Sequence, residues 1–456
     1  MILRTTTTLA ASLLVLLSGA AALAQPAPAQ PAPPAGDKPP PADTPPPPAD
    51  KPAADKPEGD KPADKPAADK PAADKPADKP EGQAAPSPEK PVAALPPVPV
   101  VVDEDLPRPF VAHAGGFSIW PIALIQVQAT PYIGENASFL AGDIAERAGF
   151  RMRRSRLGVG ASYEGLLKAE IQAELLTNAQ VTLLLNQAWI GVTPKPWFGA
   201  YIGMLDVPFS RSSLTPAADT ALIDRPLAAR ALAPQQQLGA YAHGLFAGGK
   251  FQYYLGVYNG FQRFDQFYSG YRQPLAGFGN RFDNLSYAAR IATSLDTPGE
   301  EIPLPGDRKN RMNLGASYFY SDGGARDIHA VQADALFQRS GVRILGEFLY
   351  SVAVPESVPS VPSTQTADIT SYGIVAEAGY TFRKMAGGHV RFEWIDPNTA
   401  VQDASDNWLL TVGLSFNPPV IGKYFKTQLE YTHRQEVYGL ALDNDAVTLQ
   451  AQFMLQ

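Results

Sequence analysis

The sequence contains no cysteine, and this absence excludes a disulfide framework and a lipid-modified N-terminal cysteine. Beyond its first 24 residues it also has no run of about eighteen apolar residues, so no membrane-spanning helix is predicted. After residue 115 no segment shows the apolar period of about 3.6 residues that is typical of an amphipathic helix. These absences exclude a helical membrane protein and a disulfide-stabilised secreted domain.

Motifs for catalysis are missing as well. The sequence has no G-x-S-x-G, no H-E-x-x-H and no P-loop, and its five histidines are scattered singly. We therefore predict that the protein is not an enzyme and has no cofactor, no metal site and no nucleic-acid partner. An enzyme that assembles its site from distant loops of an outer-membrane barrel is a less favoured alternative.

Composition divides the N-terminal quarter of the chain into two segments. Arg4, a short apolar core and the cleavage site Ala22-Leu23-Ala24 predict a signal peptide over residues 1–24. Residues 25–112 are dominated by Pro, Ala, Lys and Asp, and Phe110 is their only aromatic residue. Such a segment buries too little apolar surface to offset the entropy lost on ordering. We predict a disordered periplasmic linker, either a simple spacer or a contact with the cell wall.

Residues 113–456 alternate between apolar and polar side chains with the period of two that is typical of β-strands. In the stretch 389–394, for example, Val390, Phe392 and Trp394 alternate with charged or polar neighbours. The pattern predicts an all-β fold: a transmembrane antiparallel β-barrel of about 16 strands, which would enclose a water-filled channel.

A soluble β-sandwich would alternate too, but three features favour the barrel. Most predicted strands are longer than the usual strand length of about five or six residues. Short turns alternate with long loops, as in bacterial outer-membrane barrels. Tryptophans lie near the predicted strand ends, where an aromatic girdle at the lipid interface is expected. They are Trp120, Trp189, Trp197, Trp394 and Trp408.

Several motifs resemble the phosphate-selective porin O and P family. The arginine-rich stretch Gly149–Gly158 resembles the opening motif of that family, and Ile202–Ser210 resembles the strand that leads into an inward-folded loop. Within that loop, Ile223–Pro226 resembles an acidic-Arg-Pro element. The resemblance implies an outer-membrane porin, a homotrimer and a constriction loop. At Gln235-Gln236-Gln237 the sequence departs from the family, whose members often carry a basic residue there, so strong phosphate selectivity is not expected.

The segment between Asp206 and Gln237 is too long for a tight turn and rich in apolar residues. The resemblance implies that it folds into the lumen. Candidate pore or constriction residues on the wall are Arg154, Arg156, Lys168, Arg290 and Arg391, and those in the loop are Arg211, Asp224, Arg225 and Arg230. Two roles remain open for Arg225, which either faces the permeating ion or pairs with the wall and fixes the loop.

The sequence thus predicts a general porin for passive diffusion of small hydrophilic solutes and ions. Cations outnumber anions among the positions assigned inward, and this excess predicts a weak anion (phosphate-like) preference. The expected partners are outer-membrane lipid and small anions. The alternative function is an anchor that links the outer membrane to the cell wall through the N-terminal linker.

Overall fold

The computed structural model describes most of the chain from Val111 onward. The described residues are 111–134, 148–177, 181–260, 262–263, 271–272, 285–295, 310–322, 326–355, 367–382, 385–418, 421, 424–439, 441 and 443–455. The predicted signal peptide and nearly all of the predicted linker lie outside these residues.

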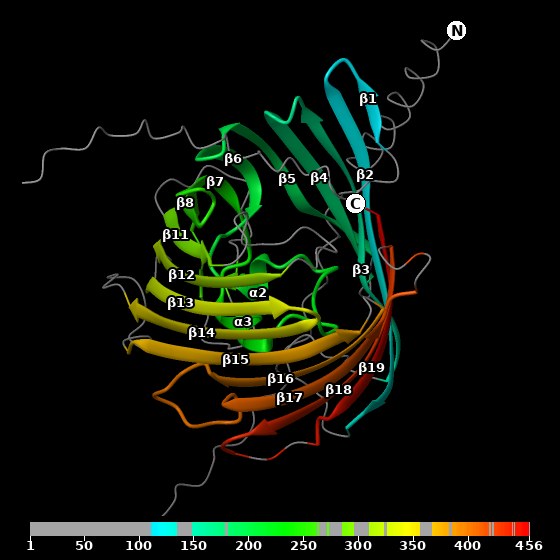
Figure 1. Ribbon diagram of the computed structural model, residues 1–456. Helices are drawn as coiled ribbons and strands as arrows, with labels where there is room; N and C mark the ends of the chain where they lie inside the picture. The colour runs from blue at the N-terminus through cyan, green and yellow to red at the C-terminus, as the bar shows by residue number, and fades with distance from the viewer. Residues whose placement is uncertain are drawn as a thin grey trace, which may run out of the picture. The chain divides into compact units, whose positions relative to one another are not determined.

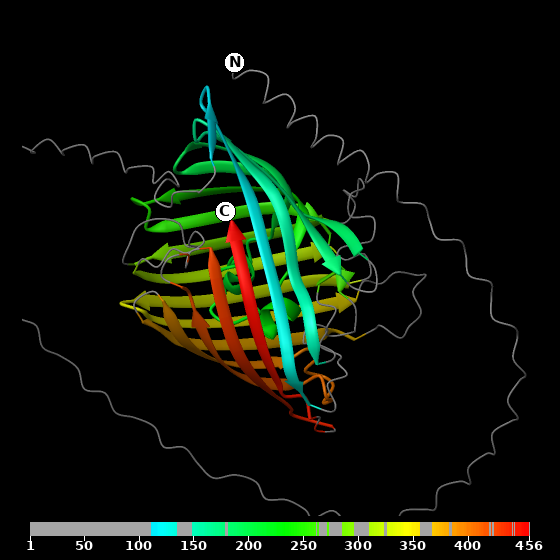
Figure 2. The ribbon, with the colours of Figure 1, turned by 90° about the vertical axis from the view of Figure 1, so that its right-hand side faces the viewer.

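Seventeen strands form one sheet, and sixteen of them close into an antiparallel barrel (Figures 1 and 2). The barrel strands are β2 Phe117–Ile133, β3 Gly149–Tyr163, β4 Leu167–Thr177, β5 Val181–Lys195, β6 Phe198–Asp206, β7 Gln236–Phe246, β8 Phe251–Asn259, β11 Leu285–Ser294, β12 Arg311–Asp322, β13 Arg326–Arg339, β14 Val342–Pro355, β15 Ile369–Phe382, β16 Ala386–Asp396, β17 Asn407–Phe416, β18 Phe425–Glu436 and β19 Ala446–Leu455. The extra strand is β1, Ala112–Ala114, which pairs with the start of β2. The predicted sixteen-strand barrel is confirmed.

The barrel closes where the last strand, β19, pairs with β2, for example at Phe453 and Ile125. A separate two-stranded sheet pairs β9, Gln262–Arg263, with β10, Tyr271–Arg272. Among the described residues, no helix is long and apolar enough to cross a membrane.

The register places apolar side chains outside and polar ones inside. On β16, Val390 is 41% exposed, whereas its neighbour Arg391 is 5% exposed and points into the lumen. A slip of one residue would exchange these faces, at roughly 2–4 kcal/mol for an arginine at the bilayer midplane. The alternation predicted from the sequence therefore has a strong energetic basis.

Two of the five tryptophans were wrongly predicted to lie at the lipid interface. Trp120 on β2 is buried, and its ring lies over Gly160 of β3. Trp189 on β5 lines a cavity inside the barrel. The first half of β2 is apolar on both faces, because Ile122 and Leu124 also point inward, so its alternation could not show which face meets the lipid there.

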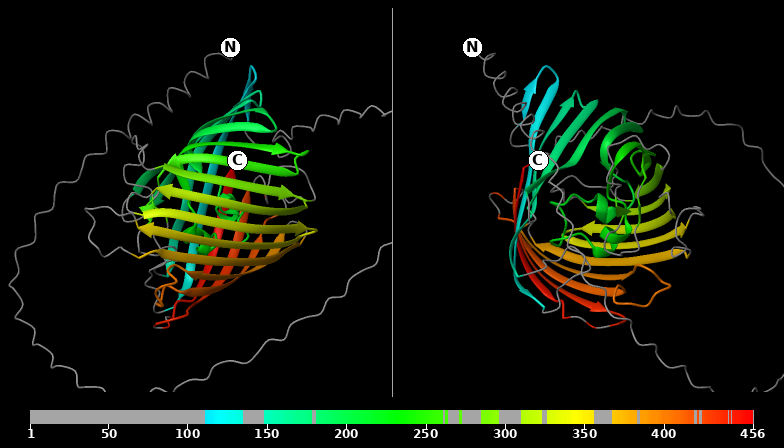
Figure 3. Two further views of the ribbon diagram at one scale, coloured as in Figure 1. Left: turned by 90° about the vertical axis from the view of Figure 1, so that its left-hand side faces the viewer. Right: turned by 180° about the vertical axis from the view of Figure 1, so that it is seen from behind.

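The segment between β6 and β7 crosses the interior of the barrel and carries two short helices, α2 Arg211–Leu214 and α3 Leu227–Leu232 (Figure 3). Helix α3 packs on β14, β15 and β16. The main apolar core lies inside the barrel beneath this loop, where Phe209 and Leu232 are buried with Phe319 and Leu349 of the wall. The loop is therefore part of the folded core.

Candidate functional site: a loop-narrowed channel

The arginines at the start of β3 are placed by a β-bulge. Strand β2 pairs Gln126 with Arg154 and Val127 with Met152, so Arg153 is an extra residue without a partner in the ladder. Such a bulge lets two consecutive side chains point to one face. Arg153 and Arg154 both reach the lumen and approach the same loop carboxylate.

That carboxylate belongs to Asp224 at the tip of the loop. Arg153 Nη2 lies 2.9 Å and Arg154 Nη1 3.7 Å from Asp224 Oδ1. From another part of the wall, Arg391 Nη1 on β16 donates to the Asp224 carbonyl oxygen at 2.9 Å. Burial raises the pKa of Asp224, but the Arg153 and Arg154 guanidinium groups outweigh burial and hold that pKa well below its usual range. Asp224 therefore stays ionised, and its contacts fix the loop to β3 and to β16.

Wall carboxylates accept hydrogen bonds from the loop backbone. Glu430 Oε2 on β18 accepts from the Ile223 amide at 2.7 Å, and Glu393 Oε2 on β16 accepts from the Ala228 amide in the first turn of α3 at 3.2 Å. Glu347 on β14 accepts from the hydroxyls of the two serines that begin α2, Ser210 and Ser212. A carboxylate satisfies amides that a short helix leaves unpaired at its start.

On β2 and at the start of β18 the pattern is reversed, and wall side chains donate to loop carbonyls. Gln126 Nε2 donates to Ala217 O at 3.2 Å, and Lys426 Nζ donates to Ala218 O at 2.8 Å and to Thr220 O at 3.1 Å. Polar groups of the loop thus find partners on several strands of the wall. These partners explain how so long a segment can be buried inside the barrel.

A buried ion network lies beneath α2. Arg211 Nε is 2.5 Å from Asp334 Oδ1, and Arg290 Nη2 is 2.7 Å from Asp334 Oδ2. Arg290 also donates to the Phe209 carbonyl at 3.1 Å, which ties β11 to the loop. Both arginines are almost fully buried, at 1% and 2% exposure, so they stabilise the base of the loop rather than line open space.

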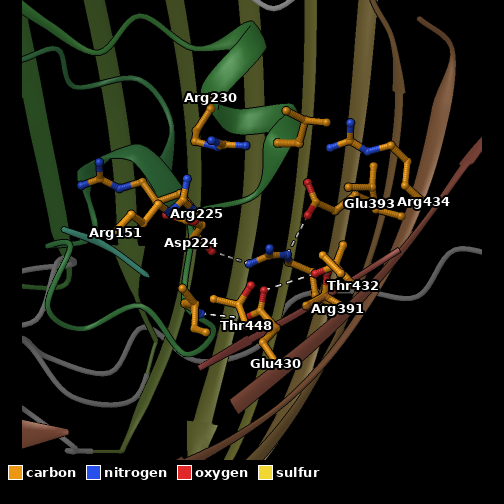
Figure 4. A pocket seen from close by; sticks show the side chains of 15 residues that line it. Arg151, Asp224, Arg225, Arg230, Arg391, Glu393, Glu430, Thr432, Arg434 and Thr448 are labelled. Atoms are coloured by element: carbon orange, nitrogen blue, oxygen red, sulfur yellow. Dashed lines mark hydrogen bonds and ion pairs between the residues drawn. The ribbon is translucent and has the colours of Figure 1, made fainter. Parts of the chain in front are cut away.

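Two cavities border the loop. The smaller, of about 50 Å³, lies beside Asp224 and is lined by five arginines and three carboxylates (Figure 4). The larger, of about 570 Å³, lies between the loop and the wall of β2 to β8 and β19. Arg225 lines both cavities, and it donates to Thr215 O within the loop at 2.7 Å. Arg225 is therefore the loop charge that borders the open space on both sides.

The structure separates the predicted site residues into three groups. Arg156 and Arg225 line the larger cavity, and Arg225, Asp224, Arg230 and Arg391 line the smaller one. Arg154 contacts the Asp224 carboxylate, and Arg211 and Arg290 lie in the buried network. Lys168 lies on β4, paired in register with Ser162 of β3. In Figure 4, Arg391 extends from the wall toward Asp224 and Glu430.

Sequence reasoning missed the role of the wall carboxylates. Glu347, Glu393 and Glu430 are among the anions that the alternation assigns inward, and the structure shows that they bind the loop. The alternation places them inward, but nothing in it identifies partners more than 100 residues away in the chain, such as Ser210 for Glu347. In the described part of the chain, no group of three or more His, Cys, Asp or Glu has the geometry to hold a metal ion.

Comparison with known proteins agrees with this geometry. The model of the family described as phosphate-selective porin O and P matches residues 133–283. The fold is similar to OmpT of Vibrio cholerae, at 10% identity and a TM-score of 0.50, over 76% of this chain and 100% of that chain. It is also similar to an anion-selective porin from Comamonas acidovorans, at 13% identity and a TM-score of 0.50, over 74% and 99%. No significant match is found among curated proteins.

At such low identities the solved structures establish the fold, and the family match adds the motifs around the loop. The barrel is closed, and its interior is crossed by a loop whose flanking sequence lies within the matched residues 133–283. The fold and the family match therefore point to a porin channel of the outer membrane rather than to an enzyme, and the matched residues are similar to the phosphate-selective porin O and P family.

Proposed function

We propose that the protein is a general porin for passive diffusion of small hydrophilic solutes and ions, with a weak preference for anions and no catalytic activity. One observation carries the proposal: although the loop is bound to the wall at several strands, it leaves a cavity of about 570 Å³ between itself and the wall of β2 to β8 and β19. Such a loop narrows a channel without plugging it. The solutes pass between the loop and the wall of β3 to β7.

The weak anion preference follows from the charges that meet at the loop. In the smaller cavity five arginines face three carboxylates, Asp224, Glu393 and Glu430. In the larger cavity, on the solute path, Arg156 and Arg225 face Glu170, Glu174 and Asp206, so the charges there nearly balance and the anion preference rests on the arginines of the smaller cavity beside the path. Fixed positive charge in a low-dielectric channel concentrates anions, but charges of both signs reduce the selectivity.

The position of the N-terminal segment supports a periplasmic linker. Strand β1 and the turn at Gly115 and Gly116 lie beside the short turn between β3 and β4, where the Glu164 amide donates to Gly116 O at 2.9 Å. Short turns are on the periplasmic side of bacterial barrels. Strand β1 therefore lies at the end of the barrel that we assign to the periplasm, and the resemblance supports a homotrimer in the membrane.

The experiment is conductance of the purified protein in planar lipid bilayers. We expect stepwise current increases in KCl and, under a salt gradient, a small reversal potential in the direction of chloride. Reversal toward potassium would contradict the anion preference. Absence of any conductance step from protein that is folded in detergent would contradict the channel and favour the anchor.

A further inference from the structure

A continuous cluster of aromatic rings covers part of the inner wall. The aromatic wall consists of Trp189 on β5, Tyr201 on β6, Tyr241 and His243 on β7, and Tyr254 on β8, four strands that lie side by side in Figure 1. Ring centroids are 5.0 Å apart between Trp189 and Tyr201 and 5.3 Å between Tyr201 and Tyr241. The chain continues through Tyr241 and Tyr254 at 5.9 Å. The rings thus form one connected surface.

Glycines in the neighbouring strands let these rings lie close against the wall. Gly191 pairs with Tyr201, and a Cβ atom on Gly191 would lie 2.4 Å from that ring. Gly199 pairs with His243, and a Cβ atom there would lie 2.5 Å from the imidazole. Any larger residue would push the ring away from the sheet. The wall therefore presents aromatic surface where polar side chains would otherwise enter the lumen.

The aromatic wall meets the larger cavity. Trp189, Tyr241 and Tyr254 line this space of about 570 Å³, and loop residues, including Arg225, line its other side. The volume lies within the range of roughly 300–1,000 Å³ that is usual for small-molecule sites. The rings therefore face the path proposed for solutes.

The polar groups around this cavity share one property. All ten polar side chains that line it besides the aromatic rings end in a planar amide, carboxylate or guanidinium group, as in Gln172, Asn186 and Gln236. Planar groups of this kind present two adjacent donors or acceptors at a fixed spacing. Vicinal hydroxyl groups of a sugar match that spacing, and the axial C–H bonds of a pyranose form a flat apolar face that packs on an aromatic ring.

We propose that the larger cavity is a subsite for pyranose sugars, which stack on the aromatic wall while their hydroxyls bind the planar groups. The inference rests on the proposed channel and names a solute class for it. Aromatic faces also bind organic cations. Arg156 and Arg225 line the same cavity together with Glu170, Glu174 and Asp206, so charges of both signs nearly balance there and suit an uncharged sugar.

The test is block of the ion current by sugars in planar bilayers. Maltose is the probe, sorbitol is a polyol without a ring, and choline is the cationic probe. We expect saturable block by maltose and a much weaker effect of sorbitol at equal concentration. Conductance in KCl with no saturable block by maltose, or block by choline alone, would overturn the sugar subsite and leave the porin standing. Absence of conductance would instead refute the porin.

Two substitutions locate the subsite. Trp189→Leu and Tyr241→Leu should each raise the dissociation constant for maltose by about tenfold, the loss expected for a good aromatic contact. Trp394→Leu is the matched control, because Trp394 lies on β16 at a position that the alternation places on the outer face. Maltose should block this variant as strongly as it blocks the unaltered channel. Equal block in all three variants would show that sugars do not contact the aromatic wall. If one lumen variant fails to insert, the other decides the question.

Discussion

Arg225 offers a direct test of how the loop sets ion preference. Arg225→Glu changes the charge beside both cavities by two units. For an ion at about 6 Å in water, each unit charge contributes roughly 0.7 kcal/mol, so the reversal amounts to about 1.4 kcal/mol. That energy is a factor of about ten in the local concentration of each ion. We expect the ratio of potassium to chloride permeability to rise by severalfold or more.

The assay is the reversal potential across a planar bilayer under a KCl gradient. The shift should be large near 0.01 M salt, where the Debye length is about 30 Å, and small near 1 M, where it is about 3 Å. Arg225→Gln should give about half the shift, because it removes one charge instead of reversing it. Lys195→Glu, at the exposed end of β5 next to the turn into β6, is the control and should leave the potential unchanged.

The reasoning would be refuted by an Arg225→Glu channel that inserts, conducts and keeps the original reversal potential at low salt. In that case the guanidinium group would serve only to bind the Thr215 carbonyl, and the selectivity would have to come from wall residues.

Three further outcomes are expected. Asp224→Asn removes the ion pairs with Arg153 and Arg154 and should increase open-channel current noise. In the unaltered channel that noise should stay low down to about pH 4, because the pKa of Asp224 is depressed. Its stabilising contribution is lost only as pH falls below the ordinary pKa range of an aspartate. Burial, together with the Asp396 and Asp403 carboxylates, raises the pKa of Asp406 to about 7. Ionisation of Asp406 therefore destabilises the fold as pH rises from about 4 to 7. Asp406→Asn should raise the melting temperature at about pH 8 but hardly at about pH 4. Deletion of residues 26–105 should leave insertion and unit conductance unchanged; an altered unit conductance would assign the segment to the pore.

The strands could be predicted because their apolar period is local and one-residue slips are costly. Along β16, each lumen residue is flanked by lipid-facing ones, so Arg391 and Glu393 were assigned inward from the pattern alone. The bulge at Arg153 could not be predicted, because one inserted residue leaves no mark in a run of arginines. The inward orientation of Trp120 was missed because the first half of its strand is apolar on both faces.

The candidate site was predictable only in part. The resemblance implied an inward loop and made Arg225 a candidate, but the sequence left its role open. In the structure Asp224 binds the wall, whereas Arg225 borders the cavities. These different roles depend on pairings between distant segments, such as Asp224 with Arg153 and Ile223 with Glu430. No periodicity encodes such pairings, since they depend on where the loop lies inside the closed barrel.

The central claim is that the open path passes between the loop and the wall, beside Arg225. The chain has no cysteine, so Arg225→Cys introduces a single thiol. A charged, water-soluble thiosulfonate reagent is added while the current of one inserted channel is recorded. The account predicts a discrete, permanent change of conductance on reaction, reversed by a reducing agent. A thiol that reacts, as shown by mass spectrometry, without any change of conductance or ion preference would contradict the account.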